Sequence, residues 1–327
     1  MSKQKRSPST KILCVCVALL FVCTTAFIAL CTVNHFLDKL NRTGTENETV
    51  APADEDFEVD GLEDTIDADT LTLDEVEPIN DDKLLNVLLI GQDRREGESG
   101  RTRSDTMILV SINTDSHKVS VISFMRDLYV LIPGYTANRM NAAYVFGGYD
   151  LLSEVILNNF GVHLDGYFMV DFADFISVID VIGGIDIYLS DEEAEIIGGD
   201  AKQGICHLDG KQALAYARIR KIDSDFGRTE RQRTVILAIF NDVKSKGLTD
   251  IMQLLDTVLP MITTNMSNID ITTYALKFIP YVSSIEVKTY NVPAKGTYAS
   301  ETIRGMSVLV PDLKAIHQLL SEEYLPL

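Results

Sequence analysis

The chain has few of the residues that commonly form metal sites or catalytic dyads. Its five histidines (His35, His117, His163, His207 and His317) show no metal-ligand spacing. The patterns G-x-x-x-x-G-K-[ST], H-E-x-x-H and G-x-S-x-G are absent, and no G-x-G-x-x-G follows a predicted strand. These absences argue against a P-loop nucleotidase, a zinc peptidase of that type, a serine hydrolase with a nucleophile elbow and a dinucleotide-binding enzyme.

Cysteine is scarce outside one short stretch. Four of the five cysteines (Cys14, Cys16, Cys23 and Cys31) lie in the same apolar run near the amino terminus, and only Cys206 lies elsewhere. The sequence therefore contains no disulfide framework and no cysteine metal site. The rest of the protein must be stabilised by its own hydrophobic core.

Charged side chains are absent from residues 12–33. As a helix at about 1.5 Å per residue, this run is about 33 Å long, enough to cross a hydrocarbon core of about 30 Å. Lys3, Lys5, Arg6 and Lys11 precede it, and positive charge favours the cytoplasmic side. We predict a cytoplasmic tail over 1–11 and a transmembrane anchor over 12–33 in a bacterial cell membrane, with the remainder outside the cytoplasm. A cleaved signal peptide is the alternative, but the run is long for one and no A-x-A-like site follows.

Lysine and arginine are absent from Glu46 to Asp82, a segment that contains sixteen Asp and Glu. It carries most of the net charge of −19. Such self-repelling acidic runs do not bury enough apolar surface to fold. We predict an acidic disordered linker over 34–82, followed by one extracytoplasmic domain over 83–327, which is long enough for a single core.

Charged residues follow or precede three predicted strands of this domain. The strands are expected at 84–90, 106–113 and 118–124, the last two forming a hairpin around the turn residues 113–116. The hairpin places Arg126 near Arg103 and Asp105. If the first strand pairs antiparallel with the second, Asp93 lies at the same edge. The alternatives are an ordinary gathering of charges in loops and a surface pair between Arg103 and Asp105.

The segment 218–233, RIRKIDSDFGRTERQR, is rich in positive charge. It contains six cations: Arg218, Arg220, Lys221, Arg228, Arg231 and Arg233. The apolar spacing that follows predicts a helix ending at Gly247, and a break at Gly227 would begin it near Arg228. Arg228 and Gln232 would then share a face. Backbone N–H groups and arginine side chains at a helix start both suit phosphate oxygens, so we predict a polyanion site; the alternative is a solvated basic helix end.

The remaining chain alternates between helical and strand patterns. Helices are expected near 151–156, 172–182, 248–259 and 312–320, and strands near 167–170, 185–189 and 285–290. This order predicts an α/β domain with helices on both faces of a mixed sheet. Arginines for phosphate and carboxylates for a divalent cation are a combination suited to phosphoryl transfer.

An ordered series of segments resembles the LytR-CpsA-Psr family of bacterial cell-wall enzymes. The segments are NVLLIGQDRREGESGRTRSDTMILVSIN, VISFMRDLYVLIPG, RMNAAYVFGG, VIDVIGGIDI and LDGKQALAYARIRKIDSDFGRTERQR. The resemblance implies an α/β/α sandwich with a pocket for a polyprenyl chain. It also implies a Mg2+-dependent phosphotransferase that moves a glycopolymer-phosphate from an undecaprenyl-pyrophosphate carrier to peptidoglycan, at the 6-hydroxyl of N-acetylmuramic acid. The implied partners are that carrier, peptidoglycan and the membrane, and no nucleic acid.

The resemblance also assigns roles to residues of this chain. Asp93 and Asp105 match carboxylates near the bound magnesium, either of which is a candidate for the catalytic base. The implied pyrophosphate-binding set is Arg95, Arg103, Arg126, Arg218, Arg220, Arg228 and Gln232, with Arg126 also catalytic and Asp225 in a supporting role. The motif around Arg126 departs from the family at Met125, where proline is usual.

Two other functions remain open at this point. A non-catalytic regulator of envelope synthesis that binds polyprenyl phosphate would keep the lipid pocket but would not need Asp93 or Asp105. A lipid pyrophosphatase would transfer the phosphate to water. The lipid pocket itself has only general candidates, Val170, Phe172, Ile176 and Ile236, each of which also fits an ordinary core.

Overall fold

A computed structural model describes residues 31–42, 76–92 and 104–327 of the protein. The predicted anchor at 12–33 lies almost wholly outside these residues. Within the described part of the chain, no helix is both long and apolar enough to cross a membrane.

The fold is built on a mixed sheet of seven strands in the order β1-β10-β7-β2-β3-β4-β11. The strands are β1 (Asn41–Arg42), β2 (Leu84–Gln92), β3 (Ser104–Asn113), β4 (Lys118–Phe124), β7 (Gly166–Asp171), β10 (Thr263–Thr264) and β11 (Glu286–Val292). β2 and β4 both pair antiparallel with β3, whereas β7 and β11 run parallel to β2 and β4, respectively. The predicted hairpin and the predicted antiparallel pairing of the first strand are confirmed.

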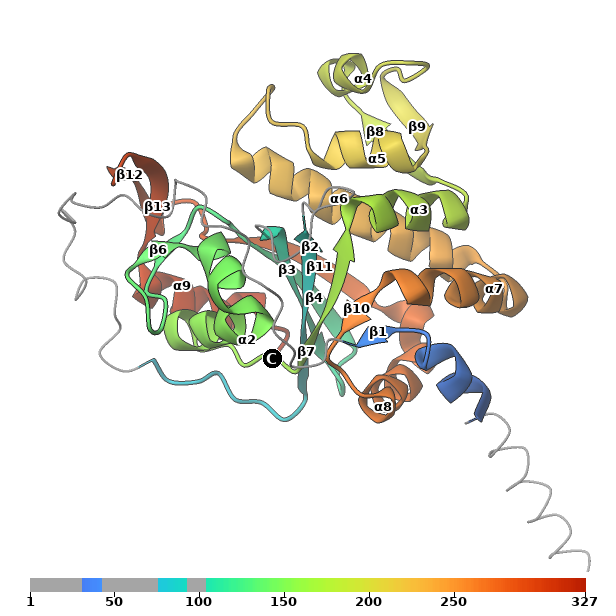
Figure 1. The fold of residues 1–327 in the computed structure, drawn as a ribbon, viewed down its shortest axis with the longest axis horizontal. Coiled ribbons are helices and arrows are strands. Elements are labelled where there is room, and N and C mark those ends of the chain that lie inside the picture. Colours follow the sequence, from blue (N-terminus) through green and yellow to red (C-terminus); the bar gives the residue numbers. More distant parts are fainter. Residues whose placement is uncertain (1–30, 43–75, 93–103) are drawn as a thin grey trace, which may run out of the picture.

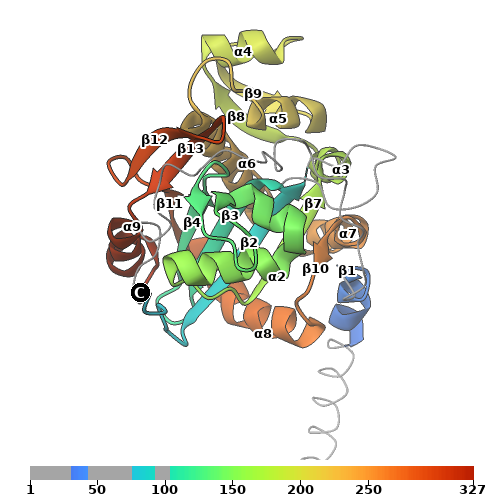
Figure 2. The ribbon, with the colours of Figure 1, turned by 60° about the vertical axis from the view of Figure 1, so that its left-hand side comes forward.

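Alternating side chains of the sheet build two separate cores, because successive residues of a strand point to opposite faces. Leu88 of β2 packs in the core that includes α2 (Met140–Phe160) and α9 (Leu313–Leu319). Val87 contacts the cluster of α8 (Asn268–Phe278) on the other face. There α3 (Phe172–Ile182), α6 (Asp225–Ser245) and α7 (Leu248–Val258) complete the helical layer (Figure 1). Helices on both faces of a mixed sheet agree with the expected fold class (Figure 2).

Smaller elements flank the sheet. β8 (Ile185–Leu189) and β9 (Gly204–Leu208) form a separate hairpin beside α4 (Asp191–Ile197) and α5 (Gly210–Ala217). A second hairpin joins β12 (Tyr298–Ile303) to β13 (Met306–Pro311), and β5 (Tyr129–Val130) pairs with β6 (Asn138–Arg139). Short helical turns follow at η2 (Leu259–Met261), η3 (Ile279–Ser284) and η4 (Leu320–Tyr324).

The predicted break at Gly227 is wrong. α6 begins at Asp225 after the cap residue Ser224, and Gly227 lies inside the helix. A carboxylate in the first turn is favoured by the helix dipole, and one internal glycine costs only about 1 kcal/mol. A Cβ atom at Gly227 would lie 2.0 Å from the Asp223 carboxylate. This glycine therefore allows a close approach and does not end the helix.

The predicted linker over 34–82 is too long at both ends. Leu37 and Leu40 are buried with Leu259, and β1 pairs with β10 at the edge of the sheet. At the other end, the Ile79 N–H donates to the Gly161 carbonyl over 2.8 Å. The acidic composition of 46–82 concealed these few apolar contacts. Residues 43–75 lie outside the described part of the chain.

Replacing Leu40 by alanine tests whether β1 belongs to the fold. Removing a buried leucine side chain should lower the free energy of unfolding by about 2 kcal/mol or more and increase amide exchange in β10. Val33→Ala is the control, since Val33 is exposed and its truncation should change neither value. Unchanged stability in Leu40→Ala would show instead that residues 34–42 are a free linker.

Candidate functional site

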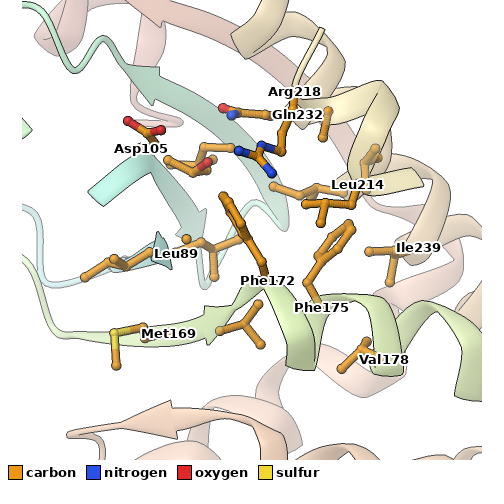
Figure 3. A pocket seen from close by; sticks show the side chains of 18 of the residues that line it. Leu89, Asp105, Met169, Phe172, Phe175, Val178, Leu214, Arg218, Gln232 and Ile239 are labelled. Atoms are coloured by element: carbon orange, nitrogen blue, oxygen red, sulfur yellow. The ribbon is translucent and has the colours of Figure 1, made fainter. Parts of the chain in front are cut away.

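A deep cavity of about 300 Å³ lies between the sheet and the helices α3, α5 and α6. Most of its wall is apolar and includes Leu89, Phe172, Phe175, Val178 and Ile239. One end is polar and is formed by Asp105, Arg218, Arg220, Arg228 and Gln232. Figure 3 shows Asp105, Arg218 and Gln232 together above the aromatic and aliphatic side chains. The cavity therefore suits an amphiphile with an anionic head.

The hairpin geometry brings Arg126 to the polar end. Arg126 follows β4 and Asp105 lies at the start of β3, and the Arg126 Nη1 is 2.9 Å from the Asp105 Oδ1. The predicted juxtaposition of these two residues is confirmed. Asp93 and Arg103, which were expected at the same edge, lie outside the described residues, as does Arg95 of the implied pyrophosphate-binding set.

The segment after α5 contributes two more arginines. The Arg220 Nη2 is 3.2 Å from the Asp105 Oδ2, so the two oxygens of this carboxylate each face a different arginine. The Arg218 guanidinium lies 4.7 Å from the centre of the Phe172 ring. An aromatic face stabilises a cation without using its N–H donors. Phe172 therefore helps to hold the Arg218 guanidinium at the wall of the cavity.

Arg228 is the most deeply buried charge of the site, with only 1% of its surface exposed. Its Nη2 donates to the Asp225 Oδ2 over 2.8 Å, but its Nε and Nη1 are buried and have no partner within the described residues. Burial, together with the nearby Arg126 and Arg220, lowers the pKa of Arg228 to about 10. Buried donors without acceptors are costly, and an anion in the cavity would supply the acceptors.

The two carboxylates of the site differ in their proton affinity. Burial tends to raise the pKa of Asp105, but Arg126, Arg228 and Arg220 outweigh it and the pKa lies below its ordinary value. Burial dominates at Asp225, so its pKa is raised despite Arg228 and Arg126. Asp105 is thus ionised at neutral pH and is a weak proton acceptor.

Not every cation of the predicted basic cluster belongs to the site. Arg231 is paired with Glu193 and Asp223, and the Arg233 Nη1 donates to the Ser123 Oγ over 2.8 Å. Both are buried and hold α6 against its neighbours. The count of positive charges in the sequence could not separate these structural arginines from the functional ones.

The predicted apolar contacts are partly correct. Val170, Phe172 and Ile236 line the cavity, whereas Ile176 does not. Ile176 instead packs its backbone against α5, where a Cβ atom at Gly210 would lie 2.2 Å from the Ile176 carbonyl oxygen. A second apolar cavity of about 300 Å³ under α8 shares Leu89 and Phe168 with the first. Its lining residues follow the ordinary apolar patterns of the strands and of α8, so the sequence does not distinguish them from a filled core.

Sequence reasoning missed Asp127. Its Oδ2 is 3.5 Å from the Arg126 Nε, and its Oδ1 is 3.5 Å from the Arg139 Nη1. Its position directly after Arg126 was the available signal. Asp127 places a third carboxylate next to the arginines.

The carboxylates do not form a preformed metal cage. Within the described ranges, no group of three or more His, Cys, Asp or Glu side chains could hold a metal ion. Asp105 is the acidic residue of the described chain that lines the apolar cavity, and Asp93 lies outside. Mg2+ commonly takes one or two protein carboxylates and completes its shell with phosphate oxygens and water. An ionised Asp105 beside a diphosphate fits that pattern.

Comparison with known proteins identifies the family of this chain. A sequence model of the LytR_cpsA_psr family matches residues 40–323. The chain belongs to this family. It is 31% identical over 225 residues to the regulatory protein MsrR of Staphylococcus aureus, covering 68% of each chain. It is 41% identical over 182 residues to the polyisoprenyl-teichoic acid–peptidoglycan teichoic acid transferase TagU of Oceanobacillus iheyensis, a match that covers 53% of this chain and 56% of that protein.

Solved structures of the LytR_cpsA_psr type share the fold. TagT bound to LIIa-WTA superimposes with a TM-score of 0.59 at 26% identity, covering 77% of this chain and 94% of that one. Bacillus subtilis TagV gives a TM-score of 0.59 at 26% identity over 74% of this chain and 98% of that one. EF0465 of Enterococcus faecalis, described as a transcriptional regulator, gives 0.60 at 27% identity, covering 77% and 91%.

Replacing Arg228 by methionine should separate ligand binding from stability. The variant should lose less stability than removal of a fully paired arginine would, because Nε and Nη1 have no partner among the described residues, although Asp225 loses its 2.8 Å contact. It should bind inorganic pyrophosphate about tenfold more weakly or worse, the loss of a charge-assisted contact worth about 1.5–3 kcal/mol. Thermal unfolding with and without pyrophosphate measures both effects.

Arg231→Met is the matched control, since Arg231 is buried in the same helix but fully engaged in ion pairs. It should lose about 1.5–3 kcal/mol of stability and keep its affinity for pyrophosphate. Equal pyrophosphate affinity in Arg228→Met and the wild type would contradict the anion site.

Proposed function

We propose that this protein is a phosphotransferase that moves a glycopolymer-phosphate from an undecaprenyl-pyrophosphate carrier to peptidoglycan, at the 6-hydroxyl of N-acetylmuramic acid. The observation that carries the proposal is Arg228, which lines the polar end of an apolar cavity and whose Nε and Nη1 have no partner among the described residues. The TagU relatives are named as teichoic acid transferases acting on peptidoglycan, although the chain spans only about half the length of those proteins.

The cavity explains why a lipid diphosphate would be chosen over a soluble one. The apolar wall removes a hydrocarbon chain from water, at about 25 cal/mol for each Å² buried. Arg218, Arg220 and Arg228 then meet the diphosphate where the chain ends. TagT has been solved bound to LI-WTA and bound to LIIa-WTA, which supports a glycopolymer as the substrate.

The reaction joins the attacking hydroxyl oxygen to phosphorus and breaks the phosphorus–oxygen bond to the departing lipid phosphate. Arg126, Arg220 and Arg228 lie where charge on these oxygens would increase, and fixed positive groups stabilise such charge. Asp105 orients Arg126 and Arg220 through its two oxygens. Its lowered pKa makes it a poor base, so Asp93 is the better candidate to accept the proton of the hydroxyl.

Mg2+ is proposed as the cofactor, held by Asp105 and Asp93 together with the phosphate oxygens. When bound, it would offset negative charge on the diphosphate. The arginines of this chain bind and orient the phosphates, and the apolar wall keeps water from them.

We also propose that residues 12–33 anchor the protein in the bacterial cell membrane, with 1–11 in the cytoplasm and the domain outside. The absence of charge from this run, preceded by four cations, supports this orientation. The substrate carrier lies in the same membrane, which fits an apolar cavity in the folded domain.

The full chain, a polyprenyl-pyrophosphate-linked saccharide, Mg2+ and uncrosslinked peptidoglycan test the proposal. A glycan joined to peptidoglycan supports transfer. Free glycosyl phosphate would instead identify a pyrophosphatase. Tight binding of the lipid without any product would identify a non-catalytic binder, a role that the name of the MsrR relative would suit.

Arg126→Ala should lower kcat/KM for this transfer by about 100-fold or more, because a fixed cation beside the reacting phosphate is lost. Lys221→Ala is the control. Lys221 belongs to the same basic stretch, but it is exposed and does not line the cavity, and its variant should keep nearly full activity. Similar losses in both variants would indicate a diffuse charge effect.

Removing divalent cations with a chelator should abolish transfer, and Mg2+ should restore it. Asp105→Asn should raise the Mg2+ concentration needed for half-maximal activity by about tenfold or more, since one anionic ligand is lost. Asp115→Asn, which changes a carboxylate paired with Lys83 far along the hairpin, should leave it unchanged. Full activity in the chelator would contradict a Mg2+ requirement.

A further inference from the structure

A third hollow, a cleft of about 320 Å³, lies beside Arg126 and Arg228, whose partners Asp127 and Asp225 line it. None of the described residues lines both this cleft and the apolar cavity. The two are connected by one ion pair, because Asp225 lines the cleft and Arg228 lines the cavity. The hairpin β12–β13 forms the outer wall of the cleft and stands on the β11 side of the sheet, away from α3 (Figure 1, Figure 2).

The chemistry of this cleft differs from that of the apolar cavity. Its lining contains three serines, two carboxylates and two aromatic rings over an apolar floor: Ser224, Ser300, Ser307, Asp127, Asp225, Phe226, Tyr298, Met125, Val308 and Leu309. Among the described residues that line the cleft there is no lysine or arginine. The carboxylates would repel a phosphate, and the hydroxyls would make a poor site for a hydrocarbon chain.

These groups match a polyhydroxylated ligand. A serine hydroxyl donates and accepts, and a carboxylate accepts strongly from a sugar hydroxyl. The Phe226 and Tyr298 rings stack with centroids 5.5 Å apart, and together they offer a rigid apolar surface to the C–H faces of a pyranose ring. Ser224, Ser300 and Ser307 are exposed, so a ligand reaches the cleft from solvent.

The carboxylates keep capacity for further hydrogen bonds. The contacts of Asp127 with Arg126 and Arg139 are both 3.5 Å long, beyond the usual range for a charged pair. Among the described residues, both ion pairs of Asp225 use Oδ2. The Asp225 Oδ1 is therefore not engaged by those arginines.

The β12–β13 hairpin is fixed to the segment that follows Arg126. The Leu309 N–H donates to the Asp127 carbonyl over 2.8 Å, and Leu309 forms an isolated bridge with Leu128. Phe226 lies in the first turn of α6, one residue after Asp225, and meets Tyr298 of the hairpin. The cleft is thus formed by the same segments that carry Arg126 and Arg228.

We propose that this cleft is a carbohydrate subsite that binds the pyranose ring next to the phosphate being transferred. The inference rests on the proposed function and extends it, because both the donor and the acceptor of such a transfer carry sugars. The Asp225–Arg228 pair sets the bound ring beside the diphosphate, and the ring belongs either to the donor glycopolymer or to the acceptor glycan.

Blocking the cleft with a bulky side chain tests the proposal. Ser300→Trp and Ser307→Trp fill it from the two strands of the hairpin. Ala299→Trp is the matched control, since Ala299 is exposed on the same strand and does not line the cleft. Thermal unfolding should show that all three variants fold. Affinity is then measured for polyprenyl pyrophosphate with and without an attached N-acetylglucosamine, and KM is measured for uncrosslinked peptidoglycan.

Two results would support the subsite and identify its occupant. If the acceptor sugar binds there, both serine variants raise the KM for peptidoglycan about tenfold or more, and lipid affinity is unchanged. If the donor sugar binds there, they reduce the affinity for the sugar-bearing lipid to that for the sugar-free lipid.

Two results would overturn it. One is agreement of both serine variants with Ala299→Trp in every measurement. The other is an equal loss of affinity for the lipid with and without the sugar, which would place the effect in the arginine cluster.

Failure of the proposed function would be recognised separately. If the wild type transfers nothing, saturation-transfer NMR with the disaccharide of N-acetylglucosamine and N-acetylmuramic acid tests the cleft directly. Loss of the signal in Ser300→Trp, with retention in Ala299→Trp, would support a carbohydrate site. Absence of a signal in the wild type would then overturn it.

Discussion

The burial of Arg228 is the constraint on which the site depends. A guanidinium that is almost fully removed from water needs acceptors for all its donors, and Asp225 satisfies only one side of it. The fold could have supplied a second carboxylate, but a fully paired arginine would bind an incoming anion less strongly. The protein thus keeps part of a buried charge uncompensated, and the resulting electrostatic cost is relieved when an anion enters.

Helix α6 contains Arg228 and connects it to the neighbouring elements of the fold. Its first turns present Asp225, Arg228 and Gln232, and the same turns hold Arg231 and Arg233, whose partners come from α4 and β4. The helix is fixed to the sheet by the Arg233–Ser123 hydrogen bond and by Ile236, and Val235 packs on its other side against α3, α5 and β8. Such polar contacts position a helix more specifically than apolar packing alone. A precise position of α6 is needed because it borders both the cavity and the cleft.

Much of the architecture could be predicted from the sequence, because the strands of the sheet have clear apolar patterns and the turn at 113–116 fixes their register. That register alone placed Arg126 next to Asp105. The resemblance to the family then supplied Arg218, Arg220, Arg228 and Gln232, all of which line the cavity. The start of α6 was less predictable. The sequence suggests a helix break at Gly227, because it does not show that the Asp223 carboxylate packs against this glycine.

Properties that arise from tertiary contact could not be predicted. Arg228 and Arg231 are three residues apart in one sequence pattern, yet they differ in their contacts. Two nitrogens of Arg228 have no partner among the described residues, whereas the Arg231 Nε donates to Glu193 and its other nitrogens are also engaged. The folding of 34–42 was hidden for a similar reason. Leu37 and Leu40 are too few to change the composition of a segment next to a long acidic run. In the folded protein they pack with Leu259, and β1 pairs with β10.

The attachment of β1 to the sheet has a consequence for where the domain works. The proposed anchor ends at residue 33 and β1 begins at Asn41. The connection between the membrane and the folded domain is therefore residues 34–40, of which Leu37 and Leu40 are buried in the fold. The acidic segment 43–75 joins two points of one folded body and adds nothing to its reach. If the proposed anchor and function hold, the domain is confined to a thin layer at the membrane surface, where it would meet the innermost glycan strands.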